Sequence, residues 1–593
     1  MEWDLSPLYA SFEDPKLEAD LSSMERAVPE ITRWVETAAF QENAAQTLAE
    51  MIEKMTVETD KIKRVQLLVM LTLSADATNK GALSLRNRTE RLIGIEFEKL
   101  QSAAVRAVGQ VRDIEEAIAA HPLLERHAFM LREMKLQADH LLDPALEPWM
   151  LRLQLTGGVA WRNLRNLLEG TMTVPIEIDG ESKRLPLPAV RNMAYSGDAQ
   201  TRKRAYEAEL AAYGQVETSL AAALNALKGE ALTFCEARHY ESLLDQTLEE
   251  SRMDRQTLEA LLEAMREALP DFRRYLKAKA RLLGHDNGLP FYDLFAPMGA
   301  GVETYTPEEA RAYLVRVLSN FSDEMGAFID RAFEERWIDL FPKKGKSGGA
   351  FCASDPQMGR SWVLTNFDGS FSAVGTLAHE LGHAFHSRCI REMPTLMSDY
   401  PMPLAETASI FNETFVSQHA LKHAAPDEAF ALLEASLMDS TQVIVDIYGR
   451  YLFETEVVEA CKTRAMSVDE LKDAMLRAQQ ASYGDGLDPD LRHPYMWACK
   501  SHYYGTSRHF YNFPYAFGLL FGLGVYAQYE AQGDAFVPVY KKLLAGTTSQ
   551  SIADVAASVG IDVRDAGFWR SSLDVIRKQI DQFVALADAR QPV

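Results

Sequence analysis

The sequence contains few cysteines, no long uninterrupted apolar run and no apolar segment near its start. Its five cysteines among 593 residues are an odd number, widely spread and without a CxxC pair, which favours reduced thiols over a disulfide framework. The first twenty residues are acidic and lack the apolar core of a signal peptide. The longest apolar run, about 513–527, is too short to span a bilayer and is interrupted by three glycines. We therefore expect a cytoplasmic protein without a membrane segment.

The chain has fewer basic than acidic residues. The 62 Lys and Arg residues against 85 Asp and Glu residues give a net charge of −23. Binding to nucleic acid needs a basic stripe, so we expect no nucleic-acid partner. Hydrophobic residues at 47% and charged residues at 25% match globular averages and exclude a disordered or fibrous chain. The sequence does not indicate an oligomeric state.

Most of the chain has the periodicity of amphipathic helices. From about residue 17 to 167, apolar positions recur at three-to-four spacing with few prolines or glycines. Residues 171–188 instead alternate on both sides of Asp179-Gly180, which predicts a β-hairpin on a two-residue turn. We place a domain boundary at this hairpin, with an N-terminal helical lobe at 1–188 and a second domain at 189–593.

A second break in the helical pattern lies between residues 343 and 370. The segments KKGKSGGAFCAS and SWVLTNFDGS predict two short strands joined by a loop around 355–359. Helical patterns then continue to the end of the chain. The predicted fold is mainly α, with a small β-sheet inserted before one particular helix.

That helix carries an HExxH motif, His379-Glu380-Leu381-Gly382-His383. At 100° per residue the two histidines lie one turn apart, so both imidazoles can reach one metal ion. Glu380 lies about 60° from His383, close enough to contact a water on the metal but poorly placed to be a ligand. A chance match is the alternative reading, because the motif is short. The pattern favours a zinc site with Glu380 as general base.

Catalytic zinc usually has three protein ligands and one water, so a third ligand is needed. The metzincin arrangement requires glycine and histidine at positions 386 and 389, where this chain has His386 and Cys389. Glu406 and Glu413, seven residues apart on a predicted helix, share one face. A turn around residues 394–403 would return Glu406 to the histidines, although two glutamates alone usually form a solvated helix face.

These residues resemble a known family. The segment TLAHELGHAFH at 376–386, followed by Glu406 and Glu413, is similar to the oligoendopeptidase F / thimet oligopeptidase family of zinc peptidases. The resemblance extends to GGAFC at 348–352, to VLTNF at 363–367 and to a tyrosine-rich segment near 502–526. It covers most of the chain from about 200 to 580, with a looser match before it. It implies two helical lobes around a deep substrate channel.

The resemblance also implies a role for each matching residue. His379, His383 and Glu406 would bind one Zn²⁺ per chain. Glu380 would take a proton from the attacking water and pass it to the leaving amine. Glu413 would accept a hydrogen bond from a ligand imidazole and orient it.

The tyrosine-rich segment contains aromatic residues at helical spacing, which are usually core residues. The resembling peptidases use one histidine and one or two tyrosines here to hold the scissile carbonyl and stabilise the oxyanion. By this resemblance we assign His502, Tyr511 and Tyr515 to that role. His509 is an alternative to His502, because the spacing from histidine to tyrosine differs among relatives.

The sequence therefore predicts a zinc-dependent oligoendopeptidase that hydrolyses internal bonds of short unstructured peptides. One alternative is a carboxypeptidase of the same family, which would need a cation for the substrate carboxylate, such as Arg388, Lys500 or Arg508. Another is a helical peptide-binding protein in which HExxH is not catalytic. The strand at 349–353 would offer an edge to an extended peptide, or form only an ordinary two-stranded ribbon.

Overall fold

The computed structural model describes residues 1–143, 145–178, 180–299 and 304–590. It is mainly helical, as predicted. Contacts along the chain divide it into two compact units. Unit 1 comprises Met1–Leu141, Glu303–His419 and Gln528–Gly560, and unit 2 comprises Leu142–Val302, Ala420–Ala527 and Ile561–Val593. The two units interleave in sequence, and the domain boundary at residue 188 stays a prediction.

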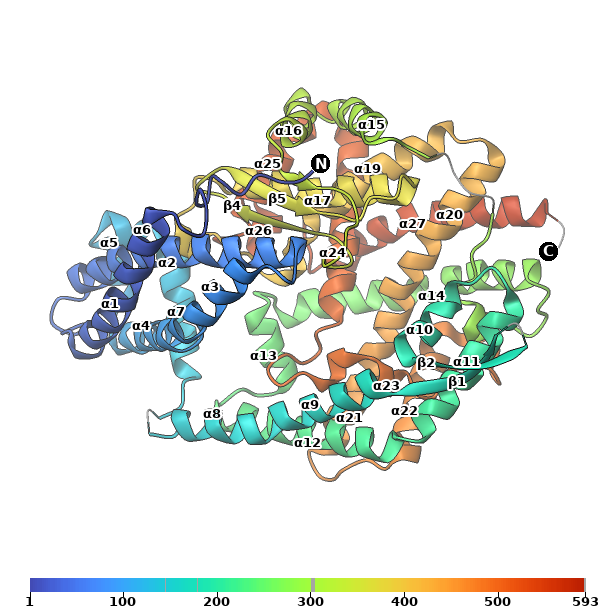
Figure 1. The fold of residues 1–593 in the computed structure, drawn as a ribbon, viewed down its shortest axis with the longest axis horizontal. Helices are drawn as coiled ribbons and strands as arrows, with labels where there is room; N and C mark the ends of the chain where they lie inside the picture. Colours follow the sequence, from blue (N-terminus) through green and yellow to red (C-terminus); the bar gives the residue numbers. More distant parts are fainter. Residues whose placement is uncertain (144, 179, 300–303, 591–593) are drawn as a thin grey trace. The chain divides into compact units, whose positions relative to one another are not determined.

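Unit 1 begins with a group of helices, drawn in blue in Figure 1, and also contains the three-stranded sheet. Its helices are α1 (Pro15–Thr37), α2 (Ala44–Ala75), α3 (Lys80–Arg91), the π-helix η1 (Leu92–Phe97), α4 (Glu98–Gln110), α5 (Ile114–Ala119), α6 (Pro122–Arg126), α7 (Ala128–Asp139), α15 (Pro307–Ser319), α16 (Asp323–Glu334), α17 (Phe371–Cys389), η4 (Thr395–Met397), α18 (Met402–Ala405), α19 (Thr407–His423, which runs on into unit 2), η8 (Gly533–Phe536), α25 (Val537–Gly546) and α26 (Ile552–Ala557). Its strands are β3 (Ile338–Asp339), β4 (Phe351–Asp355) and β5 (Arg360–Leu364).

In the described part of unit 2, the named elements are helices and one β-hairpin. Its helices are α8 (Glu147–Thr156), α9 (Gly158–Thr171), α10 (Leu187–Asn192), η2 (Met193–Tyr195), α11 (Ala199–Gly214), α12 (Glu217–Ala237), α13 (Leu243–Glu250), α14 (Arg255–Leu282), η3 (Phe291–Asp293), α20 (Pro426–Thr441), the π-helix η5 (Gln442–Asp446), α21 (Ile447–Cys461), α22 (Val468–Tyr483), η6 (Gly484–Gly486), α23 (Met496–Cys499), η7 (Ser501–Tyr504), α24 (Phe513–Gln532, which ends in unit 1) and α27 (Ala566–Asp588). The hairpin consists of β1 (Thr173–Ile178) and β2 (Glu181–Pro186).

Both predicted β features are present. β1 and β2 pair antiparallel from Thr173↔Pro186 to Ile178↔Glu181. Gly180 has a φ of 77°, as the predicted turn requires, whereas the predicted turn residue Asp179 lies outside the described residues. β4 and β5 form the predicted pair before the HExxH helix, in antiparallel register from Phe351↔Leu364 to Asp355↔Arg360.

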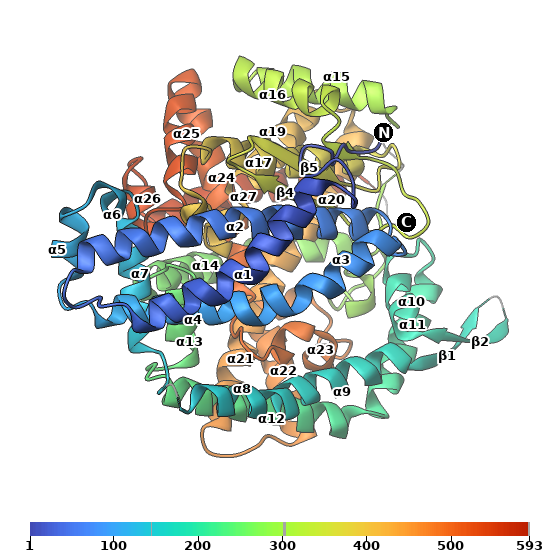
Figure 2. The same cartoon turned by 60° about the vertical axis from the view of Figure 1, so that its left-hand side comes forward.

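The sheet of unit 1 has the strand order β3-β5-β4. β3, which the sequence pattern did not reveal, is a two-residue strand parallel to β5. Both β4 and β5 contact α17, and both also contact α2, so the sheet lies between these two helices (Figure 1 and Figure 2). Trp362 and Leu364 of β5 are buried in the core formed by the N-terminal helices. This packing fixes the sheet beside the HExxH helix.

α17 has clear start and end signals. The side chain of Ser370 accepts a hydrogen bond from the backbone N–H of Ala373 and caps the first turn. The helix has no internal proline and ends at Cys389 with Arg388 in its last turn, where a cation is favourable to the helix dipole. The result is a regular helix on which His379 and His383 keep their one-turn spacing.

The structure also bears on the predictions about cysteines and about the apolar run 513–527. The five cysteines are unpaired, as predicted. Among the described residues, no helix is long and apolar enough to cross a membrane. The apolar run 513–527 is the buried part of α24, and a Cβ at Gly524 would lie 2.5 Å from Phe568 and from Ser572. This glycine therefore lets α24 and α27 pack closely.

Candidate metal centre

The two HExxH histidines project from one face of α17. Their ring centroids are 5.0 Å apart, with the ring planes at 80°. Both side chains are partly buried, at 24% and 19% exposure. Nε2 of each ring points to a common acceptor, the carboxylate of Glu406.

Glu406 lies between two helices rather than within one. It follows the four-residue helix α18 and directly precedes α19. One of its carboxylate oxygens, Oε2, lies 3.2 Å from His379 Nε2 and 3.5 Å from His383 Nε2. The hydroxyl of Ser409 donates a hydrogen bond to the same oxygen at 2.8 Å. Ser409 is a contact that the spacing of acidic residues alone did not indicate.

These three side chains form the group in the described chain that is suited to a metal ion. One donor atom from each of His379, His383 and Glu406 lies within 4.8 Å of the other two. A tetrahedral zinc with bonds of about 2.1 Å would separate two of its donors by about 3.4 Å. The distances of 3.2 and 3.5 Å match this separation, so the residues fit the ion.

A close approach of α17 and α19 brings Glu406 to the histidines. Gly382, inside HExxH, faces the start of α19: a Cβ at this position would lie 2.5 Å from the carbonyl oxygen of Ala408 and 2.6 Å from Cα of Ser409. Both atoms are backbone, so a larger residue would push the helices apart. The close approach of the two helices therefore depends on the missing side chain of Gly382.

The charges of the group favour a cation. Burial raises the pKa of Glu406, but its hydrogen bonds and the charges of the two histidines outweigh burial and lower the pKa to about 2. Burial lowers the pKa of His383 to about 4, against the opposing charge of Glu406. The group therefore offers one carboxylate and at least one neutral imidazole, the forms that bind metal ions.

His379 has a second carboxylate on its other ring nitrogen. Nδ1 lies 2.9 Å from Oε2 of Glu413, which is on α19 about two turns after Glu406. Burial lowers the pKa of His379, but the hydrogen bonds and charges of Glu406 and Glu413 outweigh it and raise the pKa to about 10. Glu413 thus contacts the Nδ1 side of the ring, while Nε2 faces Glu406.

Glu380 is buried beside the two histidines. It is 6% exposed, and its Oε2 has no hydrogen-bond partner among the described residues. Burial, with the nearby carboxylates of Glu406 and Glu413, raises its pKa to about 7, although His379 opposes this shift. A carboxyl group with a pKa near neutrality is suited to accept and return a proton.

His386 belongs to the packing around the site. Its Nε2 lies 2.8 Å from the hydroxyl of Thr547, and its ring stacks on Tyr400 at 4.2 Å with an angle of 4°. Burial lowers its pKa to about 3, so the ring is neutral. It lies outside the group of His379, His383 and Glu406.

The three residues assigned to the carbonyl also lie together, in unit 2. The ring centroids of His502, Tyr511 and Tyr515 are 5.8 to 6.2 Å apart. All three side chains are partly exposed. Burial and the charges of Arg450 and Lys500 lower the pKa of His502, so its ring is neutral at pH 7. The backbone just before Tyr511 has a φ of 52° at Phe510, a conformation that is uncommon for an aromatic residue.

His509, the alternative to His502, and the three candidate cations for a substrate carboxylate differ in their surroundings. His509 is 3% exposed, so its ring is not available to a substrate as that of His502 is. Arg508 donates a hydrogen bond to the Tyr511 hydroxyl at 3.0 Å. Lys500 is partly buried, burial lowers its pKa, and it lines a cavity of about 310 Å³ within unit 2. Arg388 is in the last turn of α17.

Comparison with known proteins gives the family. Residues 192–575 match the family described as Peptidase family M3, and residues 112–173 match the one described as Oligopeptidase F. The chain belongs to peptidase family M3. Membership in this M3 family implies peptide substrates and a metal cofactor, for which His379, His383 and Glu406 offer a suitable group.

Individual relatives of this M3 peptidase cover nearly all of it. Oligopeptidase PepF of Bacillus subtilis is 21% identical over 599 residues, with 98% of this chain and 87% of that protein covered. Group B oligopeptidase PepB of Streptococcus agalactiae is 24% identical over 590 residues, with 98% and 96% covered.

Solved structures share the fold. A crystal structure from Chlamydophila abortus superimposes with a TM-score of 0.85 at 21% identity, covering 99% of this chain and 98% of that one. The crystal structure of oligoendopeptidase-F from Enterococcus faecium superimposes with a TM-score of 0.70 at 18% identity, covering 97% and 98%. The mainly helical M3 fold is thus the fold of this chain.

Proposed function

We propose that this M3 peptidase is a zinc-dependent oligoendopeptidase that hydrolyses internal bonds of short, unstructured peptides. The convergence of His379, His383 and Glu406 beside the buried Glu380 carries the proposal. His379, His383 and Glu406 would hold the ion. When bound there, zinc lowers the pKa of a coordinated water to about 7 and polarises a carbonyl group.

Glu380 acts as the general base. Its carboxylate takes a proton from the attacking water and then gives that proton to the leaving amine. The raised pKa of Glu380 supports this double role, because a carboxyl group titrating near pH 7 accepts and donates a proton with little driving force in either direction. Glu413 holds the His379 ring in the tautomer that presents Nε2 to the metal.

His502, Tyr511 and Tyr515 are proposed to bind the scissile carbonyl and stabilise the oxyanion. The clustering of the three rings supports a common role. Each has a polar group that donates a hydrogen bond in its neutral form, and the lowered pKa of His502 keeps its ring neutral. The exposure of His502, compared with the buried His509, favours His502 for this role.

β4 is proposed to bind the peptide backbone. Within the described residues it pairs with β5 alone, so its other edge is free to bond an extended chain. Cys352 of β4 lies near Glu380: burial, and more weakly the charge of Glu380, raise the pKa of its thiol to about 12. A peptide on β4 would therefore run beside the general base.

The alternative within the family is a carboxypeptidase. Of the three candidate cations, Arg508 contacts Tyr511 directly, which would place a guanidinium beside a residue proposed to bind the carbonyl. A terminal carboxylate bound there would restrict cleavage to the peptide end. The cytoplasmic location, the absence of nucleic-acid partners and the channel between two lobes stay predictions.

Product analysis tests the proposed function. The purified protein is incubated with a pool of peptides of roughly 6 to 20 residues, and the products are identified by mass spectrometry. We expect internal cuts that are abolished by a chelator, restored by zinc, and reduced roughly 10²–10⁴-fold by Glu380→Gln with its metal content unchanged. Stepwise trimming from the C-terminal end would select the carboxypeptidase. Zinc binding without any cleavage would leave a peptide-binding protein.

A further inference from the structure

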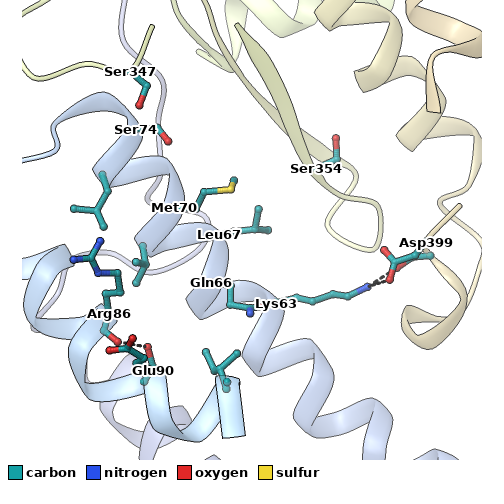
Figure 3. A pocket seen from close by; sticks show the side chains of 16 residues that line it. Lys63, Gln66, Leu67, Met70, Ser74, Arg86, Glu90, Ser347, Ser354 and Asp399 are labelled. Atoms are coloured by element: carbon teal, nitrogen blue, oxygen red, sulfur yellow. Dashed lines mark hydrogen bonds and ion pairs between the residues drawn. The ribbon is translucent and has the colours of Figure 1, made fainter. Parts of the chain in front are cut away.

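A groove runs beside the free edge of β4, entirely within unit 1. It has a volume of about 910 Å³, in the range of ligand-binding pockets, roughly 300–1,000 Å³. One wall is formed by α2, α3 and η1, and the opposite side by residues 347 and 354 near β4 and by residues 398–399 after η4 (Figure 3). We call this cavity the α2 groove.

The wall from α2 is apolar. Leu67, Met70 and Leu73 recur at helical spacing along it, and Ile93 of η1 extends it. Figure 3 shows Leu67 and Met70 on the side of α2 that faces the β4–β5 hairpin. Met70 is 42% exposed, so its side chain meets water in the groove. An exposed apolar side chain inside a concave site marks a binding surface, because covering that side chain with a ligand removes apolar area from water and stabilises the complex.

The charges at the groove are balanced. Lys63 is held by Asp399 at 3.7 Å, by the Thr395 carbonyl at 3.1 Å and by the Ser398 hydroxyl at 2.7 Å. Elsewhere Arg86 and Glu90 contribute one charge of each sign. The groove therefore has no net charge with which to select an acidic or basic side chain, despite the net charge of −23 for the whole chain.

The register of β4 determines which part of a bound peptide would face α2. Phe351 and Ala353 pack against the buried core of the N-terminal helices, as Leu67 and Leu73 of α2 do, whereas Cys352 lies near Glu380. Side chains alternate between faces along a strand. A peptide added to the edge of β4 would therefore direct every second side chain toward α2, over a strand of five residues, roughly 17 Å long.

We propose that the α2 groove is a specificity subsite that accepts a large apolar side chain of the bound peptide against Leu67, Met70 and Leu73. This inference rests on the proposed function, because the occupant is the peptide substrate itself. It assigns the selection of substrate to α2, a helix distant in sequence from HExxH. Selection acts on alternate peptide positions, because neighbouring side chains point to the opposite face of the sheet.

The test replaces Met70, the exposed residue of the apolar wall, with a charged residue. Met70→Glu and Met70→Lys are compared with Val57→Glu, a matched control on the same helix at a position that is 53% exposed and does not line the groove. The substrates are ten-residue alanine-based peptides with a single Leu, Glu or Lys moved through each position. The readouts are kcat/KM, and the affinity of the same peptides for the Glu380→Gln protein with and without the Met70 change, measured by fluorescence anisotropy.

We expect the wild-type protein to prefer Leu at one position and not at its two neighbours. Met70→Glu should lower kcat/KM for that Leu peptide by about 10-fold and shift the preference there to Lys, and Met70→Lys should shift it to Glu. The affinities should follow the same order. Val57→Glu should leave the preference unchanged.

Two results would overturn the inference: equal changes for all peptides in both Met70 variants, or an unchanged preference in both. The binding readout separates this failure from a failure of the proposed function. If the peptide affinities depend on residue 70 but no peptide is hydrolysed, the subsite is supported and the proposed peptidase activity is wrong. If peptides are hydrolysed but the preference does not depend on residue 70, the peptidase activity is supported and the subsite is wrong.

Discussion

The metal group in unit 1 and the aromatic cluster in unit 2 are built in different ways. His379, His383 and Glu406 are held by hydrogen bonds and opposite charges, with Glu413 and Ser409 as further partners. His502, Tyr511 and Tyr515 contact one another mainly through their rings. Polar contacts thus connect the first group, whereas contacts between rings connect the second.

The difference lies also in the backbone. The histidines are on the regular helix α17, where spacing alone sets their geometry. The aromatic residues come from η7, from an irregular segment and from the first turn of α24, with a left-handed residue at Phe510. Changes in the first group should therefore alter metal binding, whereas changes in the second should alter turnover alone.

The largest effect should follow from removing a ligand. His383→Ala should lose the metal and reduce hydrolysis to the limit of detection, because two ligands bind zinc far more weakly than three. Metal content by mass spectrometry and peptide turnover provide the measurement.

His386→Ala, three residues along the same helix, is the matched control. It should keep the metal while the free energy of unfolding falls by about 1–3 kcal/mol, because a buried hydrogen bond to Thr547 is lost. Loss of metal in His386→Ala, or its retention in His383→Ala, would contradict the assignment of ligands.

In the aromatic cluster, Tyr515→Phe should lower kcat by about 10²–10³-fold, the usual cost of one oxyanion donor. The metal content should stay at the wild-type value. Steady-state kinetics with a single peptide, together with metal analysis of the same sample, measures both. A loss of metal in this variant would make Tyr515 a structural residue and would remove the contrast between the two groups.

Glu413→Gln should weaken metal binding by about 10–100-fold, because the hydrogen bond to a ligand imidazole tunes its orientation and basicity. Competition with a chelator of known affinity measures this change. Glu428, a partly exposed residue in the first turn of α20, gives a control: Glu428→Gln should leave the metal affinity unchanged. Equal affinities in the two variants would show that Glu413 does not act on the metal group.

The smallest effect is expected at the helix contact. Gly382→Ala should destabilise the protein by about 1–3 kcal/mol through overpacking against Ala408 and Ser409. Gly375→Ala on the same helix meets nothing within 4 Å and should be neutral or slightly stabilising, because alanine favours helix over glycine. Thermal unfolding of both variants makes the comparison. A neutral Gly382→Ala would show that α19 does not need this close approach.

Features that depend on residues close together in the sequence could be predicted, and features that depend on tertiary packing could not. The histidine pair and the β4–β5 and β1–β2 hairpins depend on spacing within short segments, and the sequence predicted them. The position of Glu406 between α18 and α19, and the contact of Gly382 with Ala408, depend on tertiary packing. The two-residue strand β3 has too short a pattern to stand out. The α2 groove joins residues as far apart in sequence as Lys63 and Asp399, which no local pattern reveals.

X-ray absorption at the zinc edge on the purified protein tests the central claim most directly. The account predicts one zinc per chain, bound by two imidazole nitrogens and a carboxylate oxygen at about 2.0–2.2 Å, with one imidazole missing from the spectrum of any zinc that His383→Ala retains. A protein that binds no stoichiometric metal would contradict the account. So would a spectrum showing sulfur ligands, or one unchanged by the loss of His383.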